Sequence, residues 1–296
     1  REVLANIDAM ELAVEEAAVA GELTVDAITR IHRALMAEAP NAQVAGRIRT
    51  EQNWIGGNNY TPCGADFVPP PPEEVRTLLE DLCAFGAEEH LPPLVQAGLM
   101  HAQFETIHPF MDGNGRTGRA LVHVMLRRRG LAPSYVPPVS VVLAADRSRY
   151  IRGLTAFRTG DVDGWLMEFA AATAQAATLA ADYLDAVEAL QESWRSWTRS
   201  RTTLRSDAAA WRVIDVLPAH PVITLPVAVA ATGRSKAVVN QALMHLEDAG
   251  VLIRLPGGRR NRTWEAAGLL DLLASLDSAG LPPDEPPHPT TPENLA

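Results

Sequence analysis

The chain has few cysteines and no long hydrophobic run. Its 296 residues include only Cys63 and Cys83, which could form at most one bridge and lack CxxC spacing. This excludes a disulfide-stabilised scaffold and favours a reducing compartment. No stretch reaches the roughly 18 consecutive apolar residues of a membrane span, and the charged N-terminal residues are unlike a signal peptide. We therefore expect a cytoplasmic protein without membrane contact.

Basic residues are also scarce. Lys and Arg number 26 against 36 Asp and Glu, which gives a formal net charge of −10. A protein with this charge repels polyanions, which argues against nonspecific nucleic-acid binding as its main activity. Hydrophobic residues (47%) and charged residues (21%) are close to the averages of globular proteins, which excludes a disordered or collagen-like chain. At about 100 to 200 residues per domain, the length predicts two domains.

The first predicted domain, residues 1–205, is mainly α-helical. Two short apolar runs around Gly and Asn residues, between about 53 and 70, instead predict a β-hairpin. Elsewhere apolar residues recur at helical spacing. The expected helices are 25–36, 72–85, 94–107, 116–129, 149–157 and 163–197.

A second, small α+β domain is predicted over residues 206–280. Short helices at 223–251 are followed by two strands around a Pro-Gly-Gly-Arg-Arg-Asn turn. Between 206 and 265 seven basic residues outnumber five acidic ones, so this is the only basic segment. The tail 281–296 is rich in Pro and acidic residues and is expected to be disordered.

Residues 108–119 read His-Pro-Phe-Met-Asp-Gly-Asn-Gly-Arg-Thr-Gly-Arg, between two predicted helices. A glycine-rich loop that leads into a helix N-terminus offers backbone N–H groups and a positive dipole end to a phosphate. Arg116 and Arg119 lie three residues apart and can face the same polyanion. Asp112 is an oxygen ligand suited to Mg²⁺ beside phosphates, and His108 is suited to act as a general base. The pattern predicts transfer of a phosphate-containing group from a Mg²⁺-bound nucleotide.

Other phosphate and metal motifs are missing. The P-loop pattern GxxxxGK[ST] is absent, and the only lysine is Lys236. The glycines follow a helix and not a strand, which argues against a Rossmann site, and no HExxH pattern is present.

The motif resembles the signature HPFx[DE]GNGRxxR of the Fic (filamentation induced by cAMP) family at every defined position. Similarity to larger bacterial Fic proteins covers roughly residues 1–200. It includes the segments 46–49, 52–57, 67–70 and 101–107. The resemblance implies a helical bundle with a β-hairpin flap, in agreement with the hairpin expected above.

The resemblance also implies an activity, protein AMPylation. His108 would deprotonate a Ser, Thr or Tyr hydroxyl of a target protein, which attacks the α-phosphate of ATP and releases pyrophosphate. Asp112 would hold Mg²⁺. The phosphates would be bound by Gly113, Asn114, Gly115, Arg116 and Arg119.

Further roles implied by the resemblance concern the surroundings of the loop. Tyr150 would wall the adenine site, and the flap, with Ile55, Gly56, Gly57 and Phe67, would pair with an extended target segment. Kinases of the Doc type carry Lys at the position of Gly115, so the resemblance favours AMP transfer over phosphoryl transfer. Another nucleotide donor, such as CDP-choline or UTP, is an alternative.

The second predicted domain resembles a winged helix. Arg234, Lys236 and Asn240 would face a DNA groove, and Arg259, Arg260 and Arg262 would reach phosphates from the wing. The surplus of two positive charges is small, so protein recognition or homodimer formation is an equal alternative to DNA binding. A rival function is therefore a DNA-binding regulator that uses the Fic domain as a nucleotide sensor.

Overall fold

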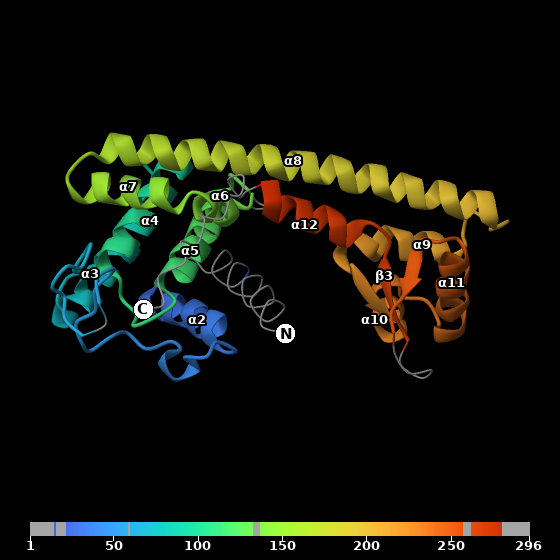
Figure 1. Ribbon diagram of the computed structural model, residues 1–296, viewed down its shortest axis with the longest axis horizontal. Helices are drawn as coiled ribbons and strands as arrows, with labels where there is room; N and C mark the ends of the chain where they lie inside the picture. The colour runs from blue at the N-terminus through green and yellow to red at the C-terminus, as the bar shows by residue number, and fades with distance from the viewer. Residues whose placement is uncertain (1–14, 16–21, 59, 133–136, 257–261, 280–296) are drawn as a thin grey trace, which may run out of the picture. The chain divides into compact units, whose positions relative to one another are not determined.

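The structure is a computed structural model that describes residue 15 and residues 22–58, 60–132, 137–256 and 262–279 (Figure 1). The chain is mainly helical with one small three-stranded sheet. Contacts between residues divide it into two compact units, residues 1–177 and 178–296. Within the part of the chain that is described, no helix combines the length and apolar character needed to cross a membrane.

The first unit is a helical bundle built around α4 (Pro93–Ile107), which packs against α3 (Val75–Ala87), α5 (Asn114–Arg128) and α7 (Arg147–Arg158). Helix α4 has buried residues on all sides, from Ala97 to Ile107, as expected of a helix in the centre of a bundle. The remaining helices of the unit are α2 (Val25–Met36), the short 3-10 helices η1 (Ala42–Val44) and η2 (Pro72–Glu74), α6 (Val139–Ala145) and the first part of α8 (Val162–Arg201).

Helix α2 shows how local sequence sets these elements. The Thr24 side chain accepts a hydrogen bond from the Ala27 N–H (3.1 Å) and so caps the N-terminus, where Asp26 also favours the helix dipole. One face, which includes Ile28, Ile31 and Leu35, is buried. The predicted range 25–36 is confirmed.

Several elements of the first unit differ from the sequence expectation. Helix α5 begins at Asn114, two residues earlier than predicted, and α6 was not predicted. The predicted flap hairpin is reduced to a single bridge between Ile55 and Phe67, in which the Ile55 N–H donates to the Phe67 carbonyl (2.9 Å). Apart from residue 59, the whole of 53–70 is described, and it contains no longer strand pair. Turn residues dominate this segment, so little chain is left for a ladder.

The second unit contains the last part of α8 and the elements α9 (Ala209–Val216), η3 (Leu217–Ala219), β1 (Val222–Thr224), α10 (Leu225–Thr232), α11 (Lys236–Asp248), β2 (Leu252–Arg254), β3 (Thr263–Ala266) and α12 (Leu269–Ala279). The antiparallel sheet has the order β1-β3-β2, with Ile223 opposite Trp264 and Ile253 opposite Glu265. Strand β1 and helix α12 were not predicted. The expected tail 281–296 lies outside the described residues.

The boundary between the units lies inside α8 at residues 177 and 178, and not near residue 205 as the sequence suggested. The reason is that the end of α8 packs into the second core: Val187 and Trp194 are buried there, and the Trp194 indole N–H donates to the Ala267 carbonyl (3.0 Å). Helical periodicity continues without interruption through α8, so the sequence carries no signal at this boundary.

Candidate active site

His108 stands at the C-terminal end of α4 in a left-handed conformation (φ 49°, ψ 61°). It is the only non-glycine residue with positive φ in the described part of the chain. The backbone N–H of His108 donates to the Phe104 carbonyl (2.9 Å) and so ends the helix. A non-glycine residue in this region costs about 1 to 3 kcal/mol and persists where the surrounding structure enforces it, often at functional sites.

The His108 imidazole is largely shielded from solvent, and its Nδ1 lies 3.9 Å from Oε2 of Glu105. The pKa of His108 is lowered to about 4, mainly by burial; a backbone interaction with Glu105 raises it, and the nearby cations Arg158 and Arg49 also contribute to lowering it. The imidazole is therefore neutral at pH 7 and can accept a proton.

Three side chains hold the backbone of the loop that follows His108. Arg49, only 3% exposed, donates from Nε to the His108 carbonyl (3.0 Å), and its other nitrogens donate to the carbonyls of Glu51, Pro70 and Ile107. The Asn53 amide donates to the Phe110 carbonyl (2.9 Å). Sequence reasoning gave neither residue a role of its own.

Asn114 completes this support. Its Oδ1 accepts from the Phe110 N–H (2.9 Å), and its Nδ2 donates to the Phe110 carbonyl (2.7 Å). The residue is 3% exposed, and its expected contact with phosphates stays a prediction. Asn114 orients the loop from inside the fold.

His32 on α2 is a further support of the loop that sequence reasoning missed. Its Nδ1 accepts from the Gly46 N–H (2.8 Å), so its Nε2 carries the proton and donates to the Asp112 carbonyl (2.9 Å). The ring stacks on Phe110, with centroids 3.7 Å apart. Burial lowers the pKa of His32, which disfavours a second proton on the ring and keeps the imidazole neutral. The sequence did carry one signal for this role, since His32 is a polar residue on the otherwise apolar face of α2.

Gly113 is required where the loop meets α5. It has φ 78°, and a Cβ there would lie 2.7 Å from Sδ of Met36. Its carbonyl accepts from the Thr117 N–H (3.0 Å), so the first turn of α5 is formed and the N-terminus of α5 is presented beside Asp112. Such a terminus favours anions.

Asp112 and Arg116 lie on the accessible side of the loop. Their closest charged atoms, Oδ1 and Nη2, are 3.7 Å apart, and the side chains are 44% and 33% exposed. Oδ2 of Asp112 accepts from Asn41 (3.2 Å). One accessible carboxylate next to an anion-binding helix N-terminus fits the way Mg²⁺ is usually held, by one or two carboxylates together with phosphate oxygens.

Arg119 lies one turn further along α5, half-buried, with its Nη1 3.0 Å from where a Cβ on Gly115 would stand. Its charge acts on Glu105 behind the loop: burial raises the pKa of Glu105 to about 7, whereas Arg119 and Arg158 lower it. Arg158 also donates to the Glu105 carbonyl (3.1 Å). The predicted loop residues His108, Asp112, Gly113, Gly115, Arg116 and Arg119 thus occupy one continuous segment.

Tyr150 contacts buried rings of the bundle, and its expected role at the adenine stays a prediction. Its hydroxyl lies 2.9 Å from Nε2 of the fully buried His101, within a cluster of rings that includes Trp165 and Phe169. These contacts give Tyr150 a role in packing α7 against α4.

The buried histidines make stability depend on pH. Burial is the main cause that lowers the pKa of His101, His108 and His123 to about 4, from 6.5. Between pH 4 and 6.5 the unfolded chain binds a proton at each of the three and the folded chain does not. The pKa of Glu105 is raised from 4.5 to about 7, so in this range the folded chain binds a proton at Glu105 that the unfolded chain largely lacks. Near pH 5 the unfolded state thus binds about two more protons than the folded state.

We therefore predict that the free energy of unfolding of the first unit falls by about 2 to 3 kcal/mol per pH unit as the pH falls below 6.5. Hydrogen exchange of the α4 and α5 amides at pH 5 and 6.5 measures this change. His123→Gln removes one titrating group and should reduce the slope by about half. An identical slope in the variant would contradict the assignment.

The flap residues differ in their surroundings. Gly56 and Gly57 both have positive φ (76° and 69°), as expected of a turn. The Phe67 ring faces the Arg158 guanidinium, with Cζ 3.7 Å from the ring centroid. Since Arg158 also binds the Glu105 carbonyl, one arm of the flap is anchored to the end of α4 that carries His108.

The two cysteines are expected to react differently. Cys63 in the flap is exposed, whereas Cys83 on α3 is buried, and burial raises the pKa of its thiol to about 11. Since the thiolate is the nucleophile, iodoacetamide at pH 7.5 should label Cys63 alone in the folded protein and both residues in urea. Peptide mass spectrometry distinguishes them, and native labelling of Cys83 would contradict this burial.

The predicted DNA-binding residues lie in the second unit. Arg234 and Lys236 are exposed at the start of α11. Asn240 is half-buried, and its Oδ1 accepts from Arg262, whose guanidinium also lies over Trp264. The hydrogen bond with Arg262 thus engages the Asn240 side chain, which was expected to face a DNA groove. Arg259 and Arg260 lie outside the described residues.

Comparison with known proteins identifies the first part of the chain. Residues 22–126 match the model of the Fic/DOC family. The chain is 31% identical over 144 residues to a protein adenylyltransferase of Caenorhabditis elegans, which covers 48% of this chain and 25% of that protein. A protein adenylyltransferase Fic of Nematostella vectensis is 34% identical over 143 residues, with 47% and 30% covered. The chain thus spans about a quarter of the length of these curated relatives.

Solved structures agree on the fold. A Fic family protein from Desulfovibrio desulfuricans has a TM-score of 0.50 and 21% identity, covering 90% of this chain and 74% of that one. A Fic domain containing signaling protein from Bacteroides thetaiotaomicron has a TM-score of 0.50 and 24% identity, covering 60% and 70%. Residues 22–126 thus match the Fic/DOC family model, and these solved structures share the fold.

Proposed function

We propose that this protein is a protein adenylyltransferase that transfers AMP from ATP to a hydroxyl side chain of a target protein. The observation that carries the proposal is His108, a neutral imidazole held in a left-handed backbone conformation at the start of a glycine-rich loop. Relatives at 31% and 34% identity are named protein adenylyltransferases, which supports the same chemistry here.

In this proposal each group of the loop has one task. His108 takes the proton of the attacking hydroxyl, whose oxygen forms the new bond to the α-phosphorus while pyrophosphate leaves. The N-terminus of α5 with Arg116 and Arg119 binds the phosphates. Asp112 holds Mg²⁺, which when bound neutralises charge on the phosphate oxygens. Ile55, Gly56, Gly57 and Phe67 align an extended target segment by main-chain pairing.

The donor and the target are separate questions. The loop binds phosphates and so supports any nucleotide with a diphosphate, which keeps CDP-choline and UTP as alternatives to ATP. Intact-mass spectrometry of the full chain, incubated with Mg²⁺ and each nucleotide with and without cell lysate, tests the donor. An adduct of the mass of AMP, formed with ATP and lost in Arg116→Ala, is expected. If adducts formed only with another nucleotide, that nucleotide and not ATP would be the donor. The absence of any adduct under all conditions would contradict the proposal.

A second role is supported by the second unit. We propose that this unit is a winged helix, which is supported by its order of helix, strand, two helices and two strands and by the sheet order β1-β3-β2. We propose that α11 acts as its recognition helix through Arg234 and Lys236. A sequence-specific DNA shift that is lost in the double variant Arg234→Ala/Lys236→Ala and kept in His108→Ala would favour a DNA-binding regulator. A shift that survives the double variant would contradict this role for α11.

A further inference from the structure

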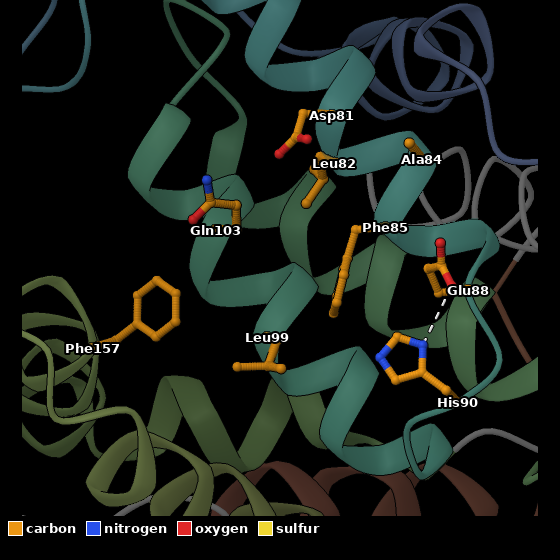
Figure 2. Close-up of a pocket in the computed structure, with 9 residues that line it drawn as sticks. All are labelled: Asp81, Leu82, Ala84, Phe85, Glu88, His90, Leu99, Gln103 and Phe157. Carbon is orange, nitrogen blue, oxygen red and sulfur yellow. Dashed lines mark hydrogen bonds and ion pairs between the residues drawn. The ribbon is translucent and has the colours of Figure 1, made fainter.

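A cavity of about 550 Å³ lies on the first unit among α3, α4 and α7, and it shares no residue with the loop 108–119. Cavities of about 300 to 1,000 Å³ are the usual size of small-molecule sites. Neither the proposed transfer reaction nor its target contacts use this cavity. Figure 2 shows its lining residues.

The middle of the cavity is apolar. Phe85 from α3, Leu99 from α4 and Phe157 from α7 all line the cavity, and Figure 2 shows Phe157 on the opposite side of the view from Phe85. All three side chains are only half-buried, so each keeps apolar surface that a ligand would remove from water. The two phenyl rings also offer π-faces that attract cations.

Both ends of the cavity are polar, and each has a carboxylate. Asp81 and Gln103 stand at one end, and Glu88 stands at the other, where its Oε2 is 3.3 Å from Nδ1 of His90 (Figure 2). All the residues named as its lining are described, and they include no lysine or arginine. The nearby Arg129 guanidinium donates to the carbonyls of Glu88, Glu89 and Leu91 and to the Gln96 side chain. The lining side chains of the cavity thus include two carboxylates and no Lys or Arg.

We propose that this cavity binds a small organic cation, an amine or guanidine carried on an aromatic or aliphatic body. The body packs among Phe85, Leu99 and Phe157, and the cation is paired with Asp81 or Glu88 at one end. Since exposed ion pairs contribute little by themselves, apolar contact and charge act together. This combination favours an amphiphilic cation over both a neutral hydrocarbon and an inorganic ion.

The probe for this site is 4-phenylbutylamine, with 4-phenylbutyrate as its anionic counterpart. Each is titrated into the full chain with labelled leucine methyl groups. The amine should shift the Leu82 and Leu99 signals in a saturable way, and the carboxylate should bind at least about tenfold more weakly. Equal binding of the two probes, or shifts that spare both leucines, would overturn the proposal.

Substitutions of the lining residues test which side chains contact the amine. The double variant Asp81→Asn/Glu88→Gln should weaken binding of the amine up to about fivefold, because it removes both carboxylates with which the one cation can pair and an exposed ion pair contributes little. Phe157→Leu should weaken it several-fold. Glu80→Gln is the matched control, since Glu80 is exposed on the same helix, lies 3.8 Å from Arg76 and does not line the cavity. Unchanged binding in the double variant, or an equal loss in Glu80→Gln, would refute the site.

Discussion

His108→Ala is expected to lower the rate of AMP transfer by about 10²- to 10⁴-fold, the range of a lost general base. Nucleotide binding should persist, because the proposed phosphate contacts come from α5, Arg116 and Arg119 and not from the imidazole. Single-turnover transfer from labelled ATP measures the first quantity, and equilibrium binding of labelled ATP measures the second. His220→Ala, in the second unit, is the matched control. A variant that loses ATP binding in parallel with transfer would show that His108 is a binding residue.

The pH dependence of the transfer rate of the wild-type protein is a second test of His108 as the general base. Burial lowers the pKa of His108 to about 4, so its neutral fraction stays close to one from pH 8 down to about pH 5.5. The transfer rate should therefore not fall through an apparent pKa of 6.5, as it would with an exposed imidazole. Short assays are needed, since the first unit loses stability over the same acid range. An acid limb centred at 6.5 would contradict the buried position of His108.

The loop could be predicted from the sequence because its groups are adjacent in the chain. His108, Asp112, Arg116 and Arg119 fall within twelve residues, and their spacing across a helix start brings them to one side without any knowledge of the fold. The helices flanking the loop were predicted for a related reason, since periodicity is also a local signal.

The support of the loop could not be predicted, because it comes from residues far away in the chain. Arg49 reaches the His108 carbonyl across 59 positions, and His32 reaches the Asp112 carbonyl across 80. Both act on backbone carbonyls, which exist at every residue and leave no pattern in the sequence. Tyr150 is a similar case, because its contact with His101 joins residues 49 positions apart and no local pattern indicates it.

Arg49→Lys is the second change with a large expected effect. The guanidinium of Arg49 contacts the carbonyls of His108, Ile107, Glu51 and Pro70 together. A lysine ammonium is a compact charge that cannot reproduce this planar fork. At least two of these carbonyls, which are buried or partly buried, would lose the bond from this side chain, at about 1 to 3 kcal/mol each.

We therefore expect the free energy of unfolding of the first unit to fall by about 2 to 4 kcal/mol in Arg49→Lys. Hydrogen exchange of the α4 and α5 amides measures this loss. Transfer should fall more than tenfold even where the protein stays folded, because His108 keeps its left-handed backbone only while its carbonyl and that of Ile107 are held. Arg47→Lys is the matched control, since Arg47 is exposed two residues earlier. If both variants had the same stability and transfer rate, the planar guanidinium of Arg49 would not be needed to hold the loop, which would contradict this prediction.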